Sequence, residues 1–281
     1  MTTSPWVAVR EALAQATRRF VDLLDGVKDV GAPAVGTWNV GEVGAHVREV
    51  TTLNSLFAFD QDPPCELRAL YAKAREVSID TVAELNDLAL SVWVERSPRR
   101  LAAAIYAQVS FLLDGTSDAH GDEQIAWLGG MKVPLKLLVA HTLSELFVHG
   151  NDIARAEGRV FTLPASHADL IFERFLFELL RSPDVATFAA ARATAARPVT
   201  CELRLRGASP VLLVTHEGAV AVEEPGHRRP IDVRISADPD AMWLVMNHRM
   251  SPLRASLHGA VIVWGRRPWR MRRLTRVLRA A

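Results

Sequence analysis

Cysteine is scarce in this chain, which has only Cys65 and Cys201 among 281 residues. The two lie far apart in the sequence and form no Cys-x-x-Cys pair, so the chain offers no disulfide framework. Neither has a catalytic motif around it, and we interpret both as structural cysteines. So few cysteines are typical of proteins in a reducing compartment, and we expect a cytoplasmic protein.

Net charge is also nearly absent, since 33 Lys and Arg against 32 Asp and Glu leave +1. This balance argues against an overall electrostatic attraction to nucleic acid or to an anionic membrane. The exception is residues 266–276, which are dense in arginine. We interpret them as the solvated basic face of a C-terminal helix. The alternative is an anion-binding surface for substrate carboxylates or nucleic acid, and the near-neutral chain counts against nucleic acid.

Long apolar runs are missing as well. The longest, roughly residues 101–113, is interrupted by Gln108 and Ser110 and is shorter than the about 20 residues that a membrane helix needs. The first 20 residues carry charges where a secretory signal needs an apolar core. There is also no phosphate-binding glycine loop, no dinucleotide fingerprint and no nucleophile elbow. We therefore expect no membrane segment and no nucleotide or nucleophilic-triad chemistry.

Helical patterns dominate the first two thirds of the chain. Asn39, followed by Glu42 three residues later, predicts a capping box at the start of a helix that ends near Phe59. Residues 115–131 are rich in Gly and Asp and predict a long loop, and no segment here has a strand pattern. Apolar periodicity predicts the other helices over 5–25, 66–76, 80–95, 98–113, 134–157 and 166–181.

The pattern changes after Pro183. Residues 185–196 are rich in alanine and predict a helix or a helical linker. Short alternating runs then predict strands over 199–205, 211–215, 220–223 and 231–236. We expect a helix over 238–247, a strand or strand pair over 254–264, and a final helix over 268–280. The sequence thus predicts an α domain over 1–182 and an α+β domain over 183–281.

The helix predicted over 134–157 carries an unusual polar stripe. An ordinary surface helix also has a polar face, but such a face usually carries Lys, Arg and several Glu. Two histidines among few charges favour a lined cavity instead. The stripe consists of His141, Ser144, Glu145, His149 and Asp152.

Three of these side chains could serve as metal ligands. His141, Glu145 and His149 follow one another at four-residue steps, each roughly 6 Å along a helix axis. The outer two are therefore roughly 12 Å apart, and one metal ion can take only one neighbouring pair. Spacing does not decide between the pair His141 and Glu145 and the pair Glu145 and His149. Asp152 is a candidate for orienting a ligating imidazole.

A further histidine, His46, falls among Val43, Val47 and Val50 on the apolar face of the earlier helix. Taken alone, such a residue is more often a hydrogen-bonded core histidine. Paired with the later helix, it would bring one carboxylate and two imidazoles to one point. That set suits zinc and leaves room for an exchangeable fourth ligand.

Two segments of this first part resemble a known family. Trp38-Asn-Val-Gly-Glu-Val-Gly-Ala-His46 and Glu145-x-x-x-His149-Gly-x-Asp152 resemble the mycothiol-dependent maleylpyruvate isomerase family, within the wider group of DinB-like helical bundles. The resemblance implies that His46, Glu145 and His149 are the metal ligands. It leaves Asp152 and His141 as candidates for contacts around them.

The C-terminal part is similar to the sterol-carrier-like domain that follows the bundle in this family. The similarity lies in residues 236–243 and 257–265. It implies a DinB-like four-helix bundle over 1–182 and a sterol-carrier-like α/β sandwich over 183–281. The chain departs from the family at two places. It has His248-Arg249 where the family often has Gly-Arg, and Gly265-Arg266 where the family tends to have Gly-Asp.

The family resemblance implies an enzyme in which zinc activates a small thiol such as mycothiol. The thiolate would isomerise an electrophilic small molecule or be transferred to it. Arg249 and Arg254 are candidates for binding substrate carboxylates. We expect no nucleic-acid or membrane partner, and a monomer or homodimer. The rival is a non-enzymatic small-molecule or lipid carrier with a structural or vestigial metal site. A structural site would be closed by a fourth protein ligand, His141 or His120.

Overall fold

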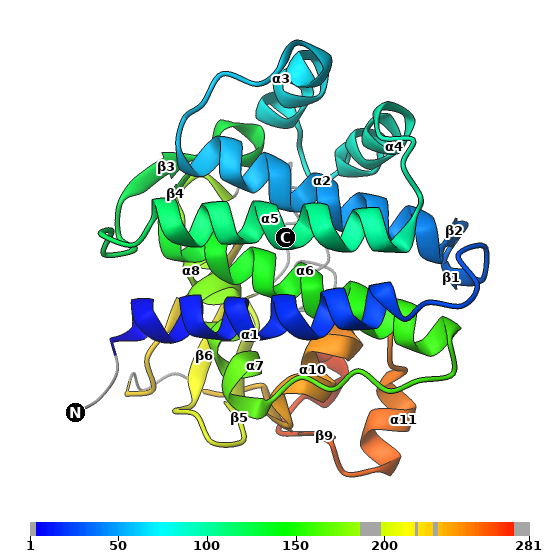
Figure 1. Cartoon of the computed structure of the whole chain (residues 1–281). Helices are drawn as coiled ribbons and strands as arrows, with labels where there is room; N and C mark the ends of the chain where they lie inside the picture. Colours follow the sequence, from blue (N-terminus) through cyan, green and yellow to red (C-terminus); the bar gives the residue numbers. More distant parts are fainter. Residues whose placement is uncertain (1–3, 186–197, 217–218, 227–229, 273–281) are drawn as a thin grey trace. The chain divides into compact units, whose positions relative to one another are not determined.

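The computed structural model describes residues 4–185, 198–216, 219–226 and 230–272 (Figure 1). The chain divides into two compact units. The first comprises Met1–Val77 and Thr81–Leu163, and the second comprises Ser78–Asp80 and Pro164–Ala281. Each unit has its own buried apolar side chains. None of the helices within the described residues is long and apolar enough to cross a membrane.

Four long helices form the body of the first unit (Figure 1). They are α1 (Pro5–Asp25), α2 (Val40–Ala58), α5 (Pro98–Gly115) and α6 (Leu135–Ala156). Helices α1 and α2 each pack against both α5 and α6. The apolar faces predicted from periodicity are buried between them, as for Leu13 and Phe20 of α1. The shorter helices α3 (Arg68–Glu76) and α4 (Val82–Val92) pack against each other, and α4 also packs against α2.

The predicted capping box at the start of α2 is confirmed. The backbone N–H of Glu42 donates to the Asn39 side chain at 2.9 Å, and the backbone N–H of Asn39 donates to the Glu42 carboxylate at 2.8 Å. Such reciprocal bonds satisfy two N–H groups that would otherwise lack partners at a helix start. The cap fixes where α2 begins, and therefore which side chains face α6 two turns later.

The first unit also contains short strands, so the prediction of a strand-free region was wrong. β1 (Pro33–Val35) pairs with β2 (Trp38–Asn39), and β3 (Gln124–Ala126) pairs with β4 (Lys132–Pro134). A 3₁₀ turn, η2 (Leu128–Gly130), joins the latter pair inside the segment predicted as a long loop. Strands of two or three residues are too short to show a period-two pattern, which is why the sequence did not reveal them.

A five-stranded sheet is the centre of the second unit. Its order is β7-β6-β5-β8-β9, and only the β5–β8 pair is parallel among its four pairings in the described residues. Val233, Ile235 and Ala237 alternate with more exposed residues, as expected for a sheet with one covered face. The strands are β5 (Thr200–Leu205), β6 (Val211–His216), β7 (Ala219–Glu223), β8 (Val233–Ala237) and β9 (Val261–Trp264).

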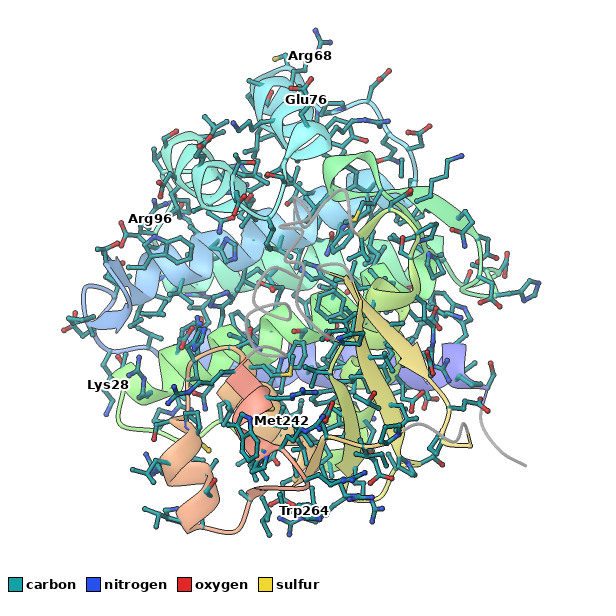
Figure 2. The ribbon with its side chains drawn as sticks, turned by 180° about the vertical axis from the view of Figure 1, so that it is seen from behind. Lys28, Arg68, Glu76, Arg96, Met242 and Trp264 are labelled. Atoms are coloured by element: carbon teal, nitrogen blue, oxygen red, sulfur yellow. The ribbon has the colours of Figure 1, made fainter. Side chains whose placement is uncertain are left out.

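Two helices interrupt the sheet, α10 (Pro239–Met246) and α11 (Pro252–Leu257). The first confirms the predicted helix after Asp238, whereas a strand was predicted where α11 lies. Ser251 caps α11 by accepting the backbone N–H of Arg254 at 3.1 Å, and Pro252 occupies its first turn. Figure 2 labels Met242 on α10 and Trp264 at the end of β9. Only the part after Leu257 is a strand.

The helix predicted over 166–181 is present but irregular, and it groups with the second unit. It consists of α7 (Ala165–Ile171), a π-helical turn η3 (Phe172–Leu176) and α8 (Phe177–Arg181). The rings of Phe172 and Phe175 lie 5.3 and 6.0 Å from that of Trp243 on α10. The compact units therefore divide before this helix, at Leu163–Pro164, whereas the sequence placed the boundary near residue 182.

The two departures from the family lie at, or directly after, positions with unusual backbone conformation. His248 has φ +61°, a left-handed conformation that favours glycine. Gly265 has φ +135°, and a Cβ added there would lie 2.6 Å from the carbonyl oxygen of Asp232. Arg267 and Arg270 both form ion pairs with Asp232. The alanine-rich segment at 186–196 and the C-terminal helix beyond Arg272 lie outside the described residues.

Candidate metal centre

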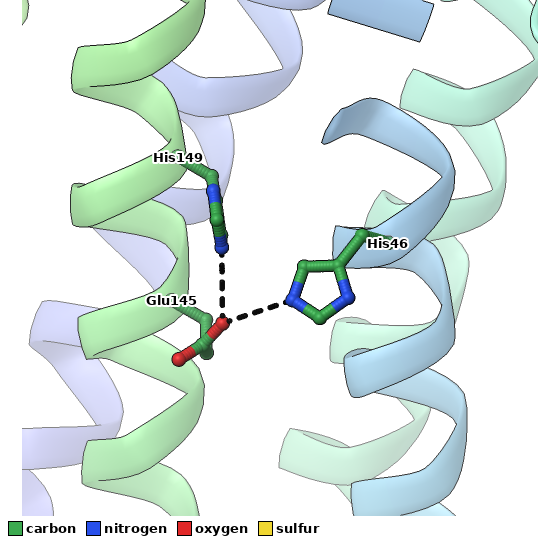
Figure 3. A group of neighbouring side chains, drawn as sticks. All are labelled: His46, Glu145 and His149. Carbon is green, nitrogen blue, oxygen red and sulfur yellow. Dashed lines mark ion pairs between the residues drawn. The ribbon is translucent and has the colours of Figure 1, made fainter. Parts of the chain in front are cut away.

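The packing of α2 against α6 brings His46, Glu145 and His149 together (Figure 3). One ligand atom from each of the three residues lies within 4.8 Å of the other two. His46 comes from α2, while Glu145 and His149 lie one turn apart on α6. Both imidazoles are buried, and the Glu145 side chain is 22% exposed. The cluster is therefore sheltered but accessible to solvent on the Glu145 side.

One carboxylate oxygen stands between the two imidazoles. Glu145 Oε2 lies 3.4 Å from His46 Nε2 and 3.3 Å from His149 Nε2. These separations are at the long end for an N–H···O hydrogen bond, whose usual length is 2.7–3.2 Å, as is the 3.5 Å from His141 Nε2 to Oε1 of the same carboxylate. The two distances from Oε2 equal the about 3.3 Å expected between two ligand atoms that are each about 2.0–2.1 Å from one tetrahedral ion. Both distances from the carboxylate oxygen thus match those of a metal-ligand set, and the three atoms together lie within 4.8 Å of one another.

The other nitrogen of each imidazole contacts a buried carboxylate. His46 Nδ1 lies 3.2 Å from Glu49 Oε2, and His149 Nδ1 lies 3.1 Å from Asp152 Oδ2. A carboxylate can only accept, so each ring places a proton on Nδ1 and turns Nε2 toward Glu145. Asp152 was a sequence candidate for this contact. Glu49 was missed, although its three-residue spacing from His46 matches that of Asp152 from His149.

His141, the other ligand candidate on α6, lies on the opposite side of the Glu145 carboxylate. Its Nε2 is 3.5 Å from Oε1 of Glu145, not from the Oε2 that faces the other two rings. Its Nδ1 lies 3.2 Å from the amide nitrogen of Asn54, a buried residue of α2 that was not among the sequence candidates. His141 does not belong to the group of ligand atoms that gather in the described residues.

The charges of the cluster are strongly coupled. Burial lowers the pKa of His46, but its contacts with Glu145 and Glu49 outweigh burial and raise the pKa to about 9. Burial raises the pKa of Glu145, but contacts with His141, His149 and His46 outweigh it and hold that pKa well below its usual range. Burial raises the pKa of Glu49, and His46 only partly offsets it. A cation entering the cluster has to displace a tightly held proton from His46.

Aromatic rings border the cluster. The Trp38 ring, from β2, lies 5.1 Å from that of His46, and the buried Trp127 ring lies 4.9 Å from that of His141. The imidazoles of His46 and His149 meet edge to face at 4.9 Å. Trp38 was part of the sequence motif, while nothing in the local sequence marked Trp127, whose contact with α6 is long-range.

The remaining candidate residues are not among the three clustered ligands. His120, the other candidate for a fourth ligand, is exposed in the loop before β3. Arg249 and Arg254 belong to the second unit, after α10 and within α11. Arg249 donates to the backbone carbonyl of Asn247 at 2.7 Å. Neither cysteine contributes to the ligand cluster; Cys65 is exposed and Cys201 is buried.

Comparison with solved structures identifies the fold. A crystal structure of mycothiol-dependent maleylpyruvate isomerase aligns with a TM-score of 0.52 over 94% of this chain and 95% of that one, at 15% identity. The chain has the mycothiol-dependent maleylpyruvate isomerase fold. A variant of that enzyme with one histidine changed to alanine aligns over the same shares of both chains, at TM-score 0.52 and 14% identity. No protein-family model and no curated protein matches the sequence.

The fold match confirms the resemblance that the two sequence segments suggested, at the level of architecture. It covers both units of this chain, so the shared fold extends beyond the bundle that carries the histidines. At this identity the comparison establishes the fold alone, and the chemistry has to be argued from the side chains of the cluster.

Proposed function

We propose that this chain is a metal-dependent enzyme that uses a small thiol such as mycothiol. His46, Glu145 and His149 would hold one divalent ion, with zinc the metal that fits best. The observation that carries the proposal is the arrangement of three single ligand atoms from two packed helices. Around them stand two carboxylates that fix the imidazole orientations, Glu49 and Asp152.

The spacing of the ligand atoms favours zinc over an octahedral ion. Two imidazoles and one carboxylate also serve non-haem iron, so the residue types alone do not choose the metal. On one face of an octahedron, ligand atoms about 2.1 Å from the ion would lie about 3.0 Å apart. The distances from Glu145 Oε2 to the two Nε2 atoms are 3.4 and 3.3 Å. The two histidine–carboxylate distances are nearer to the tetrahedral value of about 3.3 Å.

When bound, a zinc ion lowers the pKa of a coordinated thiol and so supplies a thiolate near neutral pH. The residues of the chain provide the conditions for this. Glu49 and Asp152 accept from the Nδ1 atoms of His46 and His149 and so point the Nε2 atoms at the centre. The Trp38 ring lies against that of His46, which is buried. A protein that takes its thiol from solution needs no catalytic cysteine, in agreement with the positions of Cys65 and Cys201.

The reaction we propose is isomerisation of an electrophilic small molecule, or transfer of the thiol to it. The solved relative is by name a mycothiol-dependent maleylpyruvate isomerase, and we extend thiol dependence from it to this chain. Within the same proposal the first unit is a DinB-like bundle and the second a sterol-carrier-like domain. Arg249 and Arg254 are its candidates for carboxylate binding. The protein would work in the cytoplasm, where small thiols stay reduced.

The carrier hypothesis with a closed structural zinc site fits the cluster less well. Structural zinc sites usually have four protein ligands. The group of ligand atoms within the described residues contains three. A further histidine, His141, contacts Glu145 through Oε1, the oxygen that does not face the other two rings. Three ligands and one remaining position are typical of catalytic zinc sites.

A turnover assay tests this proposal. Zinc-loaded protein is mixed with mycothiol and maleylpyruvate, together and separately, and formation of the trans isomer is followed. The proposal predicts a rate that requires thiol and metal, is lost in His149→Ala and survives in the matched variant His120→Ala.

Binding of the thiol is measured in parallel on cobalt-loaded protein, where a sulfur ligand gives a charge-transfer band. A band without isomerisation would keep the thiol enzyme and point to another electrophile. The absence of both the band and turnover would contradict the thiol-enzyme proposal and favour the carrier hypothesis.

A further inference from the structure

Three histidine rings surround Glu145, but they do not contact it in the same way. His46 and His149 direct Nε2 toward Oε2, whereas His141 directs Nε2 toward Oε1. His141 and His149 are both four residues from Glu145, so sequence spacing treats them as equivalent. What separates them is the group that contacts the Nδ1 atom of each ring.

The orientation of the Asn54 amide is fixed by its partners. The indole N–H of Trp127 can only donate, and it lies 3.1 Å from Asn54. The atom on that side must therefore be the amide oxygen. The amide nitrogen consequently faces His141 Nδ1 at 3.2 Å and Thr142 Oγ1 at 2.9 Å. All three side chains around Asn54 belong to the first unit, and Asn54 itself is buried.

Thr142 supports the same orientation. Its hydroxyl donates to the backbone carbonyl of Leu138 at 3.0 Å, so its oxygen is available to accept from Asn54. A rotated amide would place its nitrogen against the indole N–H, leaving two donors facing each other in a buried site. An unmade hydrogen bond of this kind costs about 1–3 kcal/mol. The Asn54 amide therefore presents an N–H group to His141.

Since Asn54 donates, His141 Nδ1 must accept, and a neutral His141 ring carries its proton on Nε2. That N–H faces Oε1 of Glu145. Glu49 and Asp152 instead accept from Nδ1 of His46 and His149, so displacing the proton from Nε2 of either ring frees a lone pair for a metal ion. Only a nitrogen with a free lone pair can bind a metal ion. The carboxylates of Glu49 and Asp152 thus orient two of the rings as metal ligands. The Asn54 amide orients the third ring, that of His141, as a hydrogen-bond donor.

We propose that His141 is a positioning residue that holds Glu145 by Oε1 and leaves Oε2 alone to face His46 and His149. Glu145 is then a one-atom ligand, and the site keeps its remaining position for an exchangeable molecule. Without this contact the carboxylate is free to turn and bind an ion through both oxygens. The inference deepens the proposed function and rests on it for the role of the metal, but the tautomer of His141 does not depend on any ion.

The tautomers are measured in the metal-free protein by long-range ¹H–¹⁵N correlation NMR of the histidine rings at mildly alkaline pH. We expect the His141 proton on Nε2 and the His149 proton on Nδ1. His141 with its proton on Nδ1 would overturn the proposal. This measurement uses the protein without any substitution, so its result does not depend on a variant that fails to fold.

A variant tests whether Asn54 selects the tautomer. In Asn54→Asp a carboxylate oxygen replaces the amide N–H, so the His141 proton should move to Nδ1. Thr142→Ser is the matched control, because it keeps the hydroxyl that accepts from Asn54 and should leave the tautomer unchanged. A folded Asn54→Asp protein with the His141 proton still on Nε2 would contradict the assignment.

The positioning role is read from the cobalt spectrum of the loaded protein. In His141→Ala the freed carboxylate should bind through both oxygens, and the visible absorbance should fall as the coordination number rises. His141→Gln offers an amide N–H in place of the ring N–H and should restore the original spectrum.

The outcomes separate the two proposals. An unchanged spectrum in His141→Ala would overturn the positioning role while the metal site stands. If the unaltered protein binds no cobalt, the proposed function fails, and the NMR result still decides the tautomer.

Discussion

Glu49 Oε2 lies 3.2 Å from Nδ1 of His46, one turn further along α2. Asp152 has the same relationship to His149 on α6, at 3.1 Å. Two helices from distant parts of the sequence thus carry the same local unit, a histidine with a buried carboxylate three residues later. Each unit turns its Nε2 toward the same oxygen of Glu145, and the proposed metal site is built from these two units and one carboxylate.

Removing either buried carboxylate should weaken metal binding without removing a ligand. We expect Glu49→Ala and Asp152→Ala each to reduce zinc affinity by about 10–100-fold, the usual effect of losing a group that orients a ligating histidine. Chelator competition measures the affinities. Glu11→Ala, an exposed position on α1, serves as the control and should bind zinc like the unaltered protein. Equal affinities in all four proteins would contradict the orienting role.

Metal binding should strengthen as pH rises. In the folded metal-free protein, contacts with Glu145 and Glu49 raise the pKa of His46 to about 9. A proton on His46 therefore competes with the metal ion throughout the neutral range. Because one proton is displaced, zinc affinity should increase by up to about tenfold per pH unit and level off near pH 9. Calorimetry in buffers of different ionisation enthalpy measures the released proton. A pH-independent affinity would argue against His46 as a ligand.

The same shift predicts how the stability of the metal-free protein varies with pH. The pKa of His46 is about 9 in the folded chain against an ordinary 6.5, so its stabilising contribution is complete below about pH 6.5. That contribution is lost as pH rises through about 9. Glu145, whose pKa is depressed, contributes above its ordinary pKa and loses this on acidification.

Denaturant unfolding from about pH 6 to about pH 10 measures this effect. The difference in unfolding free energy between the unaltered protein and His46→Gln should shrink toward the alkaline end. A difference that grows with pH would mean that folding does not raise the His46 pKa.

The two cysteines should differ sharply in reactivity. Cys65 is exposed, whereas Cys201 is buried in β5, and burial raises the pKa of its thiol to about 12. Alkylation of the native protein should therefore modify Cys65 alone, and denaturant should make Cys201 reactive. Mass spectrometry counts the modified thiols. Loss of zinc or of turnover in Cys65→Ser would show that the chain does use its own thiol.

A close contact behind His149 should make Gly150 intolerant of a side chain. A Cβ at Gly150 would lie 2.5 Å from the ring of Phe161, which is itself buried. Gly150→Ala should destabilise the protein by about 1–3 kcal/mol, as overpacked cores usually do. The measurement is the unfolding free energy. The double variant Gly150→Ala/Phe161→Leu should recover part of the loss, and full stability of the single variant would contradict the packing.

The locally determined features were predictable from the sequence. The Asn39–Glu42 capping box and the long helices depend on residues a few positions apart, and the structure has them where the sequence placed them. The α11 helix was misread as a strand because Leu253 and Leu257 are apolar but highly exposed. The π-helical turn over 172–176 coincides with ring contacts to Trp243. No local sequence pattern predicts these contacts.

The site shows the same division between local and long-range information. Spacing predicted that Glu145 would share a helix face with His141 and His149, and it could not rank the two histidines. Their difference comes from Asn54, which lies 87 residues before His141 in the sequence. The Glu49 contact was visible in principle, because its spacing from His46 repeats that of Asp152 from His149.

His46, Glu145 and His149 together should hold one catalytic divalent ion. Metal content per chain, by mass spectrometry on protein purified without a histidine tag, tests this expectation most directly. We expect about one zinc per chain in the unaltered protein and in His120→Ala, and a large loss in His149→Ala. Unaltered protein that holds no metal, even after reconstitution with zinc, would contradict it.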